Sequence, residues 1–503
     1  MARSRDSGVL RRIGLALSGL LVLALTVGVG FAGTLAGPPE TTTIEVEPLS
    51  VGAGATTWVC AAAPTLPTAA AGDDVDYDPD LGTGGGAVAT LADLTALGGD
   101  QAPTMTVGPI AEAGSDAGTA GPLATVSQLD ITDPYVGVVE PFADTVPLVA
   151  GLSIARADAG DMRGLSVTTC QQPVSSAVIV GGSTQLGASA RLVLSNPGET
   201  TASVTLTGWG ATGPLPDIAP MVVPAGGVRT MLLETISLEP RLAIRLDVEG
   251  GRVVPTIQDT SLNGLIPAGT EIVGPAADPT TDLTIAGSAL SDADSASALL
   301  RLLNPGADAA TVQVEMLGPE GAAVLAGAEA SVIEPGTVAD ISLAGLPTGL
   351  YGVRVTSDVP ITGAVQLSRT GTAGEDDPDT APVDIAWLPA SPPVSAGVLP
   401  VPSGLVDTAV LTVTNPGTAD TDVSVRTYDA TGQVGLETTV AVAAGATAEL
   451  EVPDDTIAVV LEGEEILASA VVAGDAENGS LIAAYPLVND PYTEQSVVVR
   501  VTD

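Results

Sequence analysis

Apolar and polar residues alternate along short stretches of this chain, and the alternation predicts β-strands. Leu192 and Leu194 precede an Asn-Pro-Gly sequence, and Val204 and Leu206 follow it. A spacing of two places such side chains on one face of a pleated strand. Beyond the N-terminal segment, no long stretch of the sequence has the 3.6-residue period of an amphipathic helix. We therefore expect an all-β structure after that segment.

The pattern recurs three times with a period of about 110 residues, which suits a sandwich of seven to nine strands. The three Asn-Pro-Gly sequences are Asn196, Pro197 and Gly198; Asn304, Pro305 and Gly306; and Asn415, Pro416 and Gly417. Proline presets the first central position of a turn and glycine supplies positive φ at the second, so each sequence predicts a hairpin turn. Another glycine follows a short aliphatic strand in each copy, at Gly226, Gly336 and Gly445.

These signals divide the chain into five parts. We expect an N-terminal stub with a membrane anchor, a β domain closed by a disulfide, and three Ig-like antiparallel sandwiches. The corresponding ranges are 1–40, 41–175, 176–290, 291–395 and 396–503.

The N-terminus has the pattern of a membrane segment. Arg3, Arg5, Arg11 and Arg12 precede the uncharged stretch 13–36. As a helix this stretch would be about 36 Å long, enough to cross a bilayer. Secretory signal peptides usually have shorter apolar regions, so we favour an uncleaved signal anchor, with a cleaved signal peptide as the alternative. The arginines predict a cytoplasmic N-terminus and a single-pass membrane protein with a large extracellular part.

The cysteine count agrees with export. The chain has two cysteines, Cys60 and Cys170. In an oxidising compartment two cysteines most simply form one disulfide, and two free thiols are the alternative. Closing a loop of about 100 residues would stabilise the fold by about 4–5 kcal/mol in the chain-entropy description.

Composition excludes several functions. The chain has 60 acidic and 16 basic residues, a formal net charge of −44 and no histidine, and all its basic residues are arginine. Ser-His-Asp and Cys-His catalysis and His-ligated zinc are therefore excluded, as are Schiff-base lysines and lysine-containing P-loops. The negative charge also makes nucleic-acid binding unfavourable.

One acidic cluster matches part of a calcium loop. Asp74, Asp76 and Asp78 occupy the first three ligand positions of such a loop. The sixth position is Pro79 instead of glycine, and the twelfth is Gly85 instead of glutamate. The cluster is thus a candidate calcium site or a solvated acidic loop, and we expect no other cofactor.

Three short motifs carry a resemblance to a known family. They are Trp58-Val59-Cys60, Cys170-Gln171-Gln172-Pro173 and Val180-Gly181-Gly182, followed by Leu-x-Leu-x-Asn-Pro. In this combination the chain resembles an actinobacterial family of membrane-anchored envelope proteins of unknown function. The resemblance implies a location in the cell envelope and a link to cell-wall polymer assembly.

Together these observations favour a non-enzymatic, membrane-anchored extracellular scaffold or spacer of the bacterial cell envelope. The alternative is a protein that binds cell-wall glycans or mediates adhesion, with help from calcium. We expect each of the three tryptophans to fill a core or a domain junction, and Trp209, between two glycines, is the one that would be exposed to a sugar in the alternative. Expected partners are the membrane, through the N-terminal helix, and envelope proteins or wall polymers.

Overall fold

The structure is a computed structural model that describes most of the chain between residues 54 and 489. The described residues are 17–18, 20–21, 23–24, 49–50, 54–66, 80, 82–94, 105–112, 119–120, 123–128, 133–141, 148–291, 293, 295–374, 378–489 and 496–497. They fall into two compact units. Met1–Val51 and Ser496–Asp503 form the first unit, and Gly52–Gln495 forms the second.

The first unit contains little described structure. β1 (Leu49–Ser50) pairs antiparallel with β34 (Ser496–Val497). Within the predicted membrane segment 13–36, the residues that are described are helical. In the described part of the chain, no helix is both long enough and apolar enough to span a membrane. The membrane anchor therefore stays a prediction.

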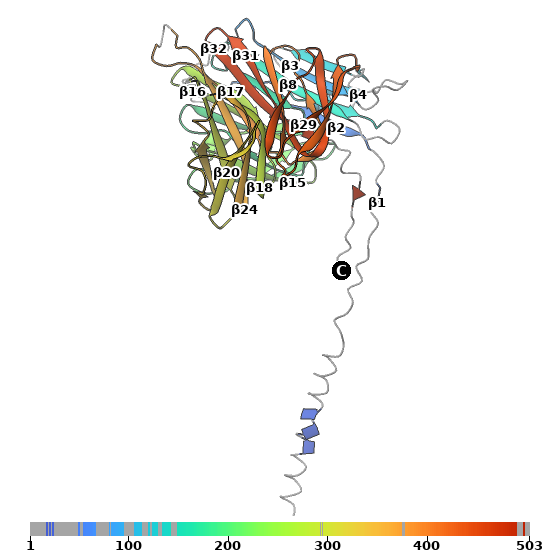
Figure 1. Cartoon of the computed structure of the whole chain (residues 1–503), viewed down its shortest axis with the longest axis vertical. Coiled ribbons are helices and arrows are strands. Elements are labelled where there is room, and N and C mark those ends of the chain that lie inside the picture. Colours follow the sequence, from blue (N-terminus) through green and yellow to red (C-terminus); the bar gives the residue numbers. More distant parts are fainter. Residues whose placement is uncertain are drawn as a thin grey trace, which may run out of the picture. The chain divides into compact units, whose positions relative to one another are not determined.

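The second unit consists of antiparallel strands in four β-sandwiches, which confirms the all-β prediction (Figure 1). Each sandwich has eight strand positions with the same chain order. Positions one, six, three and four form the first sheet, and positions five, two, seven and eight form the second. In an immunoglobulin constant domain the first strand shares a sheet with the second. Here it pairs with the sixth.

The first sandwich consists of β2 (Thr56–Cys60), β3 (Gly86–Asp93), β4 (Met105–Pro109), β5 (Thr119–Ala120), β6 (Leu123–Gln128), β7 (Tyr135–Val139), β8 (Val149–Ala157) and β9 (Gly164–Thr169), with the 3-10 turn η1 (Ile110–Glu112). The second consists of β10 (Ser176–Val180), β11 (Ala188–Asn196), β12 (Ala202–Trp209), β13 (Met221–Val223), β14 (Gly227–Leu232), β15 (Ala243–Glu249), β16 (Val254–Asn263) and β17 (Ile266–Val273), with η2 (Leu233–Thr235).

The third sandwich consists of β18 (Thr280–Leu290), β19 (Ala296–Asn304), β20 (Ala310–Gly318), β21 (Gly321–Val324), β22 (Ser331–Ile333), β23 (Thr337–Ser342), β24 (Gly349–Thr370) and β25 (Val383–Pro389). The fourth consists of β26 (Val394–Pro400), β27 (Thr408–Asn415), β28 (Thr421–Asp429), β29 (Val434–Val442), β30 (Ala446–Leu450), β31 (Thr456–Ala476), β32 (Gly479–Pro486) and β33 (Val488–Asn489). In these two sandwiches the sixth and seventh positions are one long strand, β24 or β31, that runs through both sheets. In the third sandwich β21 and β22 share the fourth position, and in the fourth sandwich the short β33 pairs with β26 outside the eight positions.

Two features of the sandwiches differ from the sequence-based division of the chain. β18 pairs with β24 of the third sandwich, so that sandwich begins at residue 280 instead of 291. The repeat was recognised from its second and third strands, and these signals do not mark where the first strand begins. The region 41–175 also contains the same strand order as the three repeats, although it has no Asn-Pro-Gly sequence.

The Asn-Pro-Gly sequences connect the two sheets of a sandwich, so the hairpin prediction is wrong. In each repeat the sequence follows the second strand, and the third strand lies in the opposite sheet. The correction applies to Asn196-Pro197-Gly198, Asn304-Pro305-Gly306 and Asn415-Pro416-Gly417. Positive φ occurs instead at Gly226, Gly336 and Gly445, where φ is 57°, 63° and 62°.

The asparagine side chain holds this connection together. Asn304 Nδ2 donates to the carbonyl oxygens of Asp308 at 2.8 Å and Ile333 at 3.1 Å, and Gly306 N donates to Asn304 Oδ1 at 3.0 Å. Asn196 and Asn415 make matching bonds. All three asparagines are buried. A buried amide thus satisfies backbone groups that no strand partner reaches.

The four sandwiches form a closed ring, in which the first sheet of one packs on the second sheet of the next. Val59 and Val136 of the first sandwich pack with Val254 of the second. Between the second and third sandwiches, Val338 N donates to the carbonyl oxygen of Gly210 at 2.9 Å. A head-to-tail interface of this kind gives a ring when the successive rotations close.

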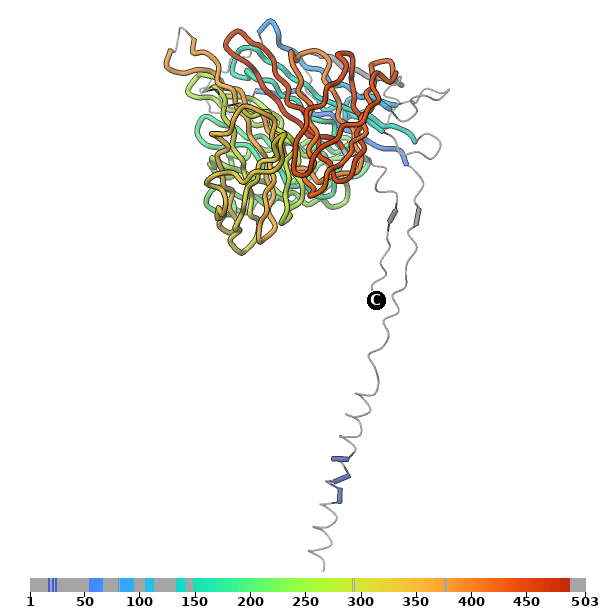
Figure 2. The backbone as a smooth tube through the Cα atoms, viewed as in Figure 1, coloured from blue at the N-terminus to red at the C-terminus, as the bar shows by residue number. Residues whose placement is uncertain are grey.

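The remaining two interfaces use the same sheets. Ser469 Oγ of the fourth sandwich donates to the carbonyl oxygen of Gly287 in the third at 2.6 Å. Val398 and Val460 of the fourth sandwich pack with Ala150 of the first. Figure 2 shows this closure as red strands of the fourth sandwich beside blue and cyan strands of the first. The recurring glycines also lie at these interfaces: a methyl group on Gly226, Gly336 or Gly445 would contact Ile110, Pro214 or Ala322 of the preceding sandwich.

Arg156 on β8 joins the end of the ring to its beginning. Its guanidinium donates to the carbonyl oxygens of Leu405 at 3.2 Å and Asp475 at 2.6 Å in the fourth sandwich. It also pairs with the carboxylates of Asp158 at 2.7 Å and Asp407 at 3.1 Å. The Arg156 side chain is only 9% exposed, so few water molecules compete for these bonds.

Replacing Arg156 with alanine should weaken the closure of the ring. The change removes charge-assisted hydrogen bonds to two carbonyl groups, and we expect a loss of about 2–3 kcal/mol in the free energy of unfolding. Urea denaturation measures this loss. The matched control is Arg245→Ala, because Arg245 pairs with Asp247 on the same strand and both side chains are exposed. The control should change stability by less than about 0.5 kcal/mol. Equal losses in the two variants would contradict this role of Arg156.

Candidate functional site at the ring axis

The eighth strands of the four sandwiches surround one axis. β9 contacts β17, β17 contacts β25, β25 contacts β32, and β32 contacts β9. Most of their residues are buried. Because the four strands belong to four sandwiches, the axis is the place where all parts of the ring meet.

A buried carboxyl group lies between three of these strands. Asp384 on β25 accepts hydrogen bonds at Oδ2 from Leu165 N on β9 at 3.1 Å and from Ile482 N on β32 at 2.7 Å. Gly164 permits this approach, because a methyl group there would lie 2.8 Å from Asp384 Oδ1. Asp384 itself is fully buried. One side chain therefore connects the first, third and fourth sandwiches.

A second buried carboxyl group connects the first and second sandwiches. Glu271 on β17 accepts at Oε1 from Ser166 Oγ on β9 at 2.7 Å and from Ile272 N at 2.8 Å. Ser166 Oγ also accepts from Ile272 N at 3.0 Å. Burial is the main cause that raises the pKa of Glu271 well above its usual value, and the Asp384 charge raises it further.

Burial likewise raises the pKa of Asp384, to about 7, although its backbone hydrogen bonds and the nearby Arg163 cation oppose the shift. Arg163 is buried too, and its Nη2 donates to the carbonyl oxygen of Gly479 at 2.8 Å. Asp384, Glu271, Ser166, Thr270 and Arg163 form a polar centre at the axis. Some of their polar atoms have no hydrogen-bond partner among the described residues. They are Asp384 Oδ1, Glu271 Oε2, Thr270 Oγ1 and Arg163 Nε and Nη1. Groups of this kind are the usual partners of buried water.

Another buried cluster joins the second and third sandwiches. Trp387 Nε1 on β25 donates to Asp259 Oδ2 on β16 at 2.9 Å, and the Arg301 guanidinium lies 4.9 Å from the centroid of the Trp387 ring. Arg301 also donates to the carbonyl oxygen of Gly182 at 2.8 Å and forms two bonds with Asp340. Burial raises the pKa of Asp259. Like the polar centre, this cluster uses charged groups to bind neighbouring sandwiches.

A cavity of about 460 Å³ lies where the eighth strands end. Residues from all four sandwiches line it, including Thr168, Ile272, Trp387 and Tyr485. A second cavity, of about 640 Å³, lies between the fourth and first sandwiches. The axial cavity thus combines contributions from the whole ring.

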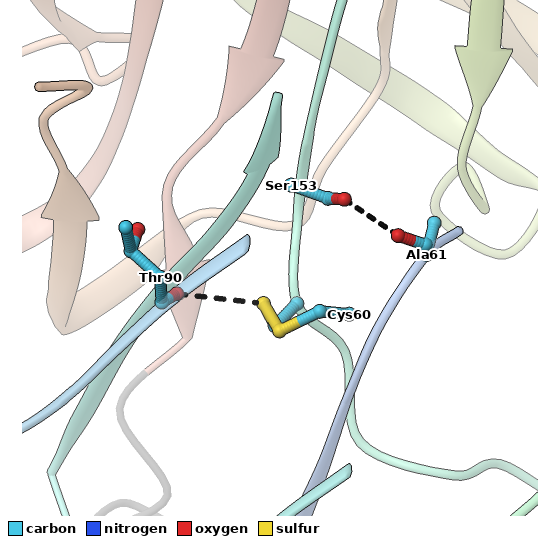
Figure 3. Close-up of a disulfide and its surroundings, with 5 residues drawn as sticks. Cys60, Ala61, Thr90 and Ser153 are labelled. Carbon is cyan, nitrogen blue, oxygen red and sulfur yellow. Dashed lines mark hydrogen bonds between the residues drawn. A yellow bond between two sulfur atoms is a disulfide. The ribbon is translucent and has the colours of Figure 1, made fainter. Parts of the chain in front are cut away.

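The disulfide lies beside this axial cavity. Cys60 at the end of β2 and Cys170 just after β9 are joined, with their Cα atoms 4.2 Å apart, so the bond links the two sheets of the first sandwich (Figure 3). The predicted pairing is therefore present. Gly151 makes room for it, because a methyl group there would lie 2.8 Å from Cys170 Sγ. Ser153 Oγ on β8 donates to the carbonyl oxygen of Ala61 at 2.5 Å, which fixes the position of the residue that follows Cys60.

None of the other predicted site residues that the structure describes is part of this centre. Asp74, Asp76 and Asp78 lie outside the described residues, so the calcium site stays a prediction. Among the residues that are described, no group of three or more Asp, Glu or Cys side chains could hold a metal ion. Trp209 is buried, with 7% of its surface exposed, which agrees with a tryptophan that fills a core and contradicts the alternative that it faces solvent. Its ring fills the core of the second sandwich.

The sequence did contain a signal for the acids that were missed. Asp384 stands inside Val383-Asp384-Ile385-Ala386-Trp387, and Glu271 precedes Ile272-Val273. An acidic residue within an apolar strand is almost never fully buried unless it has partners. Such a position therefore indicates a buried polar contact, but it does not reveal which strand supplies the partner.

The fold and the buried axis define a ring of β-sandwiches stabilised by internal polar contacts. Residues 86–453 match the model of a family of unknown function, DUF5719, and the chain belongs to this family. No curated protein matches the chain. A solved structure titled "Biofilm associated protein - BSP domain" is similar at 9% identity, covering 90% of this chain and 99% of that one, with a TM-score of 0.12. A likeness at that TM-score supports no conclusion about this protein.

Because Asp384 is buried, we expect the free energy of unfolding to fall as pH rises. Folding raises the pKa of Asp384 from 3.8 to about 7, so between these values the folded chain binds a proton that the unfolded chain has lost. Stability from this group is complete below about pH 4 and is lost towards pH 7. Between pH 5 and pH 8 it should account for a fall of about 2–3 kcal/mol in the free energy of unfolding.

Asp384→Asn should make that fall smaller, because the amide does not titrate and its oxygen can still accept from Leu165 N and Ile482 N. Urea denaturation at pH 5 and pH 8 measures the difference. The control is Asp217→Asn, at an exposed position, which should retain the fall of the parent protein. An unchanged pH dependence in Asp384→Asn would show that this carboxyl group is not the cause.

Proposed function

We propose that this protein is a non-enzymatic, membrane-anchored extracellular scaffold of the bacterial cell envelope. In this proposal the N-terminal segment 13–36 anchors the chain, and the ring is the part that meets other envelope components. The actinobacterial origin and the link to wall-polymer assembly, implied by the family resemblance, belong to the same proposal.

The use of the buried charged groups carries the proposal that the protein is not an enzyme. Asp384, Glu271, Arg156 and Arg301 all bind backbone or side-chain groups of neighbouring sandwiches. An acid-base catalyst must reach a substrate, whereas Asp384 and Glu271 have no exposed surface. These residues therefore have a structural use that explains their burial.

Two further observations support export and a scaffold. The Cys60–Cys170 disulfide is typical of an oxidising compartment outside the cytoplasm. The closed ring favours a scaffold over a spacer, because sandwiches that bridge a long distance would be strung out instead of returning to the first. The glycan-binding alternative gains no support from Trp209, which is buried.

Deleting residues 13–36 should keep the chain inside the cell. We expect to find the full chain in the membrane fraction after an alkaline wash. Protease added to intact cells should cut it, and no thiol should react with an alkylating reagent. The deletion variant should be protected from the protease and should have two reactive thiols. Replacing the segment with an alanine-leucine stretch of the same length is the control, and it should restore anchoring.

Other distributions would contradict parts of this proposal. A full chain in the cytosol with reduced thiols would contradict export, and a shortened chain in the medium would contradict only the anchor. The non-enzymatic role is tested in a strain that lacks the native gene. In that strain, Glu271→Gln should reverse the defect caused by loss of the gene to the same extent as the parent chain does. A folded Glu271→Gln protein that fails to restore function would contradict the structural role.

A further inference from the structure

The axial cavity has a lining that differs from the rest of this acidic protein. The chain carries a formal net charge of −44, but none of the described residues that line the cavity is charged. Two of the three tryptophans in the chain, Trp58 and Trp387, contribute to its wall. Most other lining residues are aliphatic or proline. A neutral lining beside so many carboxylates indicates a site that does not bind through charge.

We infer that this cavity is a binding site for an uncharged, mostly apolar small molecule that carries a hydrogen-bonding group. The volume of about 460 Å³ lies within the range of about 300–1,000 Å³ that is usual for ligand sites. The inference rests on the cavity alone and does not depend on membrane anchoring.

The charge of the chain and the neutral lining together disfavour ionic ligands at this site. An anion would approach against the negative field of the whole protein, and it would find no arginine among the described residues at the cavity. A cation would find no carboxylate among the described lining residues. Burying either ion without a partner is costly, whereas a neutral apolar molecule gains from leaving water.

Polar groups in the wall give the site a way to orient its ligand. Gln171 and Gln172 follow β9, are half-buried and line the cavity. A methyl group on Gly274 would lie 2.8 Å from Gln171 Nε2, so glycine leaves this amide room beside the adjacent strand end. Each amide can donate and accept, which suits a hydroxyl or carbonyl group on an otherwise apolar ligand.

The cavity also reaches the surface of the ring. Pro392 and Ser391 line it in the connection between β25 and β26, where Pro392 is exposed and Ser391 is half-buried. A ligand can therefore enter without the sandwiches separating. A larger side chain at either position should reduce the space available to it.

Two fluorescent probes with the same aromatic body test the inference. N-phenyl-1-naphthylamine is neutral, and 8-anilinonaphthalene-1-sulfonate adds a sulfonate to that body. The full chain, at neutral pH and physiological salt, should bind the neutral probe with a stoichiometry of one. The sulfonate probe should bind at least about tenfold more weakly, because its charge has no partner in the cavity.

Ser391→Phe should weaken binding of the neutral probe at least about tenfold by filling the cavity, with Pro392→Phe as a second variant. The matched control is Ser175→Phe, in the equivalent connection after β9, at an exposed position that is not part of the lining. It should bind like the parent protein. Thermal unfolding checks that each variant is folded.

Three outcomes would overturn the inference. The first is no binding of the neutral probe, and the second is equal binding of both probes. The third is binding that survives both cavity variants. Leu265 is 82% exposed in the turn between β16 and β17, so a loss of that binding in Leu265→Ser would place the probe on the outer surface of the second sandwich.

Discussion

The burial of the four eighth strands against one another is the constraint on which the rest of this structure depends. A sandwich that stood alone would expose the strand that now lies at the axis. The apolar clusters show this dependence, since Leu165 and Val167 of the first sandwich pack in the core of the fourth. Trp387 of the third sandwich packs in the core of the second. The other two interfaces contain similar clusters, so each sandwich shares buried apolar residues with two neighbours.

Closing the ring brings polar groups together as well as apolar ones. Where four backbones meet, amide groups point towards the axis without partners in their own sheets. Asp384 accepts hydrogen bonds from two of these amides, and Arg156 and Arg301 donate hydrogen bonds to carbonyl groups across interfaces. Buried charged groups of this kind stabilise a fold only when most of their bonds are made. These charged groups occur at the interfaces because backbone groups there lack partners within their own sheets.

The sequence predicted some levels of this structure and could not predict others. Alternation and the repeated Asn-Pro-Gly sequences were sufficient for an all-β chain with sandwich repeats, and the count of two cysteines was sufficient for their pairing. The hairpin prediction failed because a turn sequence does not tell whether the next strand joins the same sheet. The first sandwich was not recognised as a copy of the repeat, because it lacks the Asn-Pro-Gly sequence that marks the others. The axial site could not be predicted, since its residues lie in four strands about 100 positions apart.

The central claim is that the ring is one cooperative unit, because no sandwich has a complete core by itself. Scanning calorimetry of the purified chain with its disulfide intact tests this claim most directly. The account predicts a single transition for residues 54–489, with calorimetric and van't Hoff enthalpies that agree. Separate transitions that correspond to individual sandwiches would contradict it.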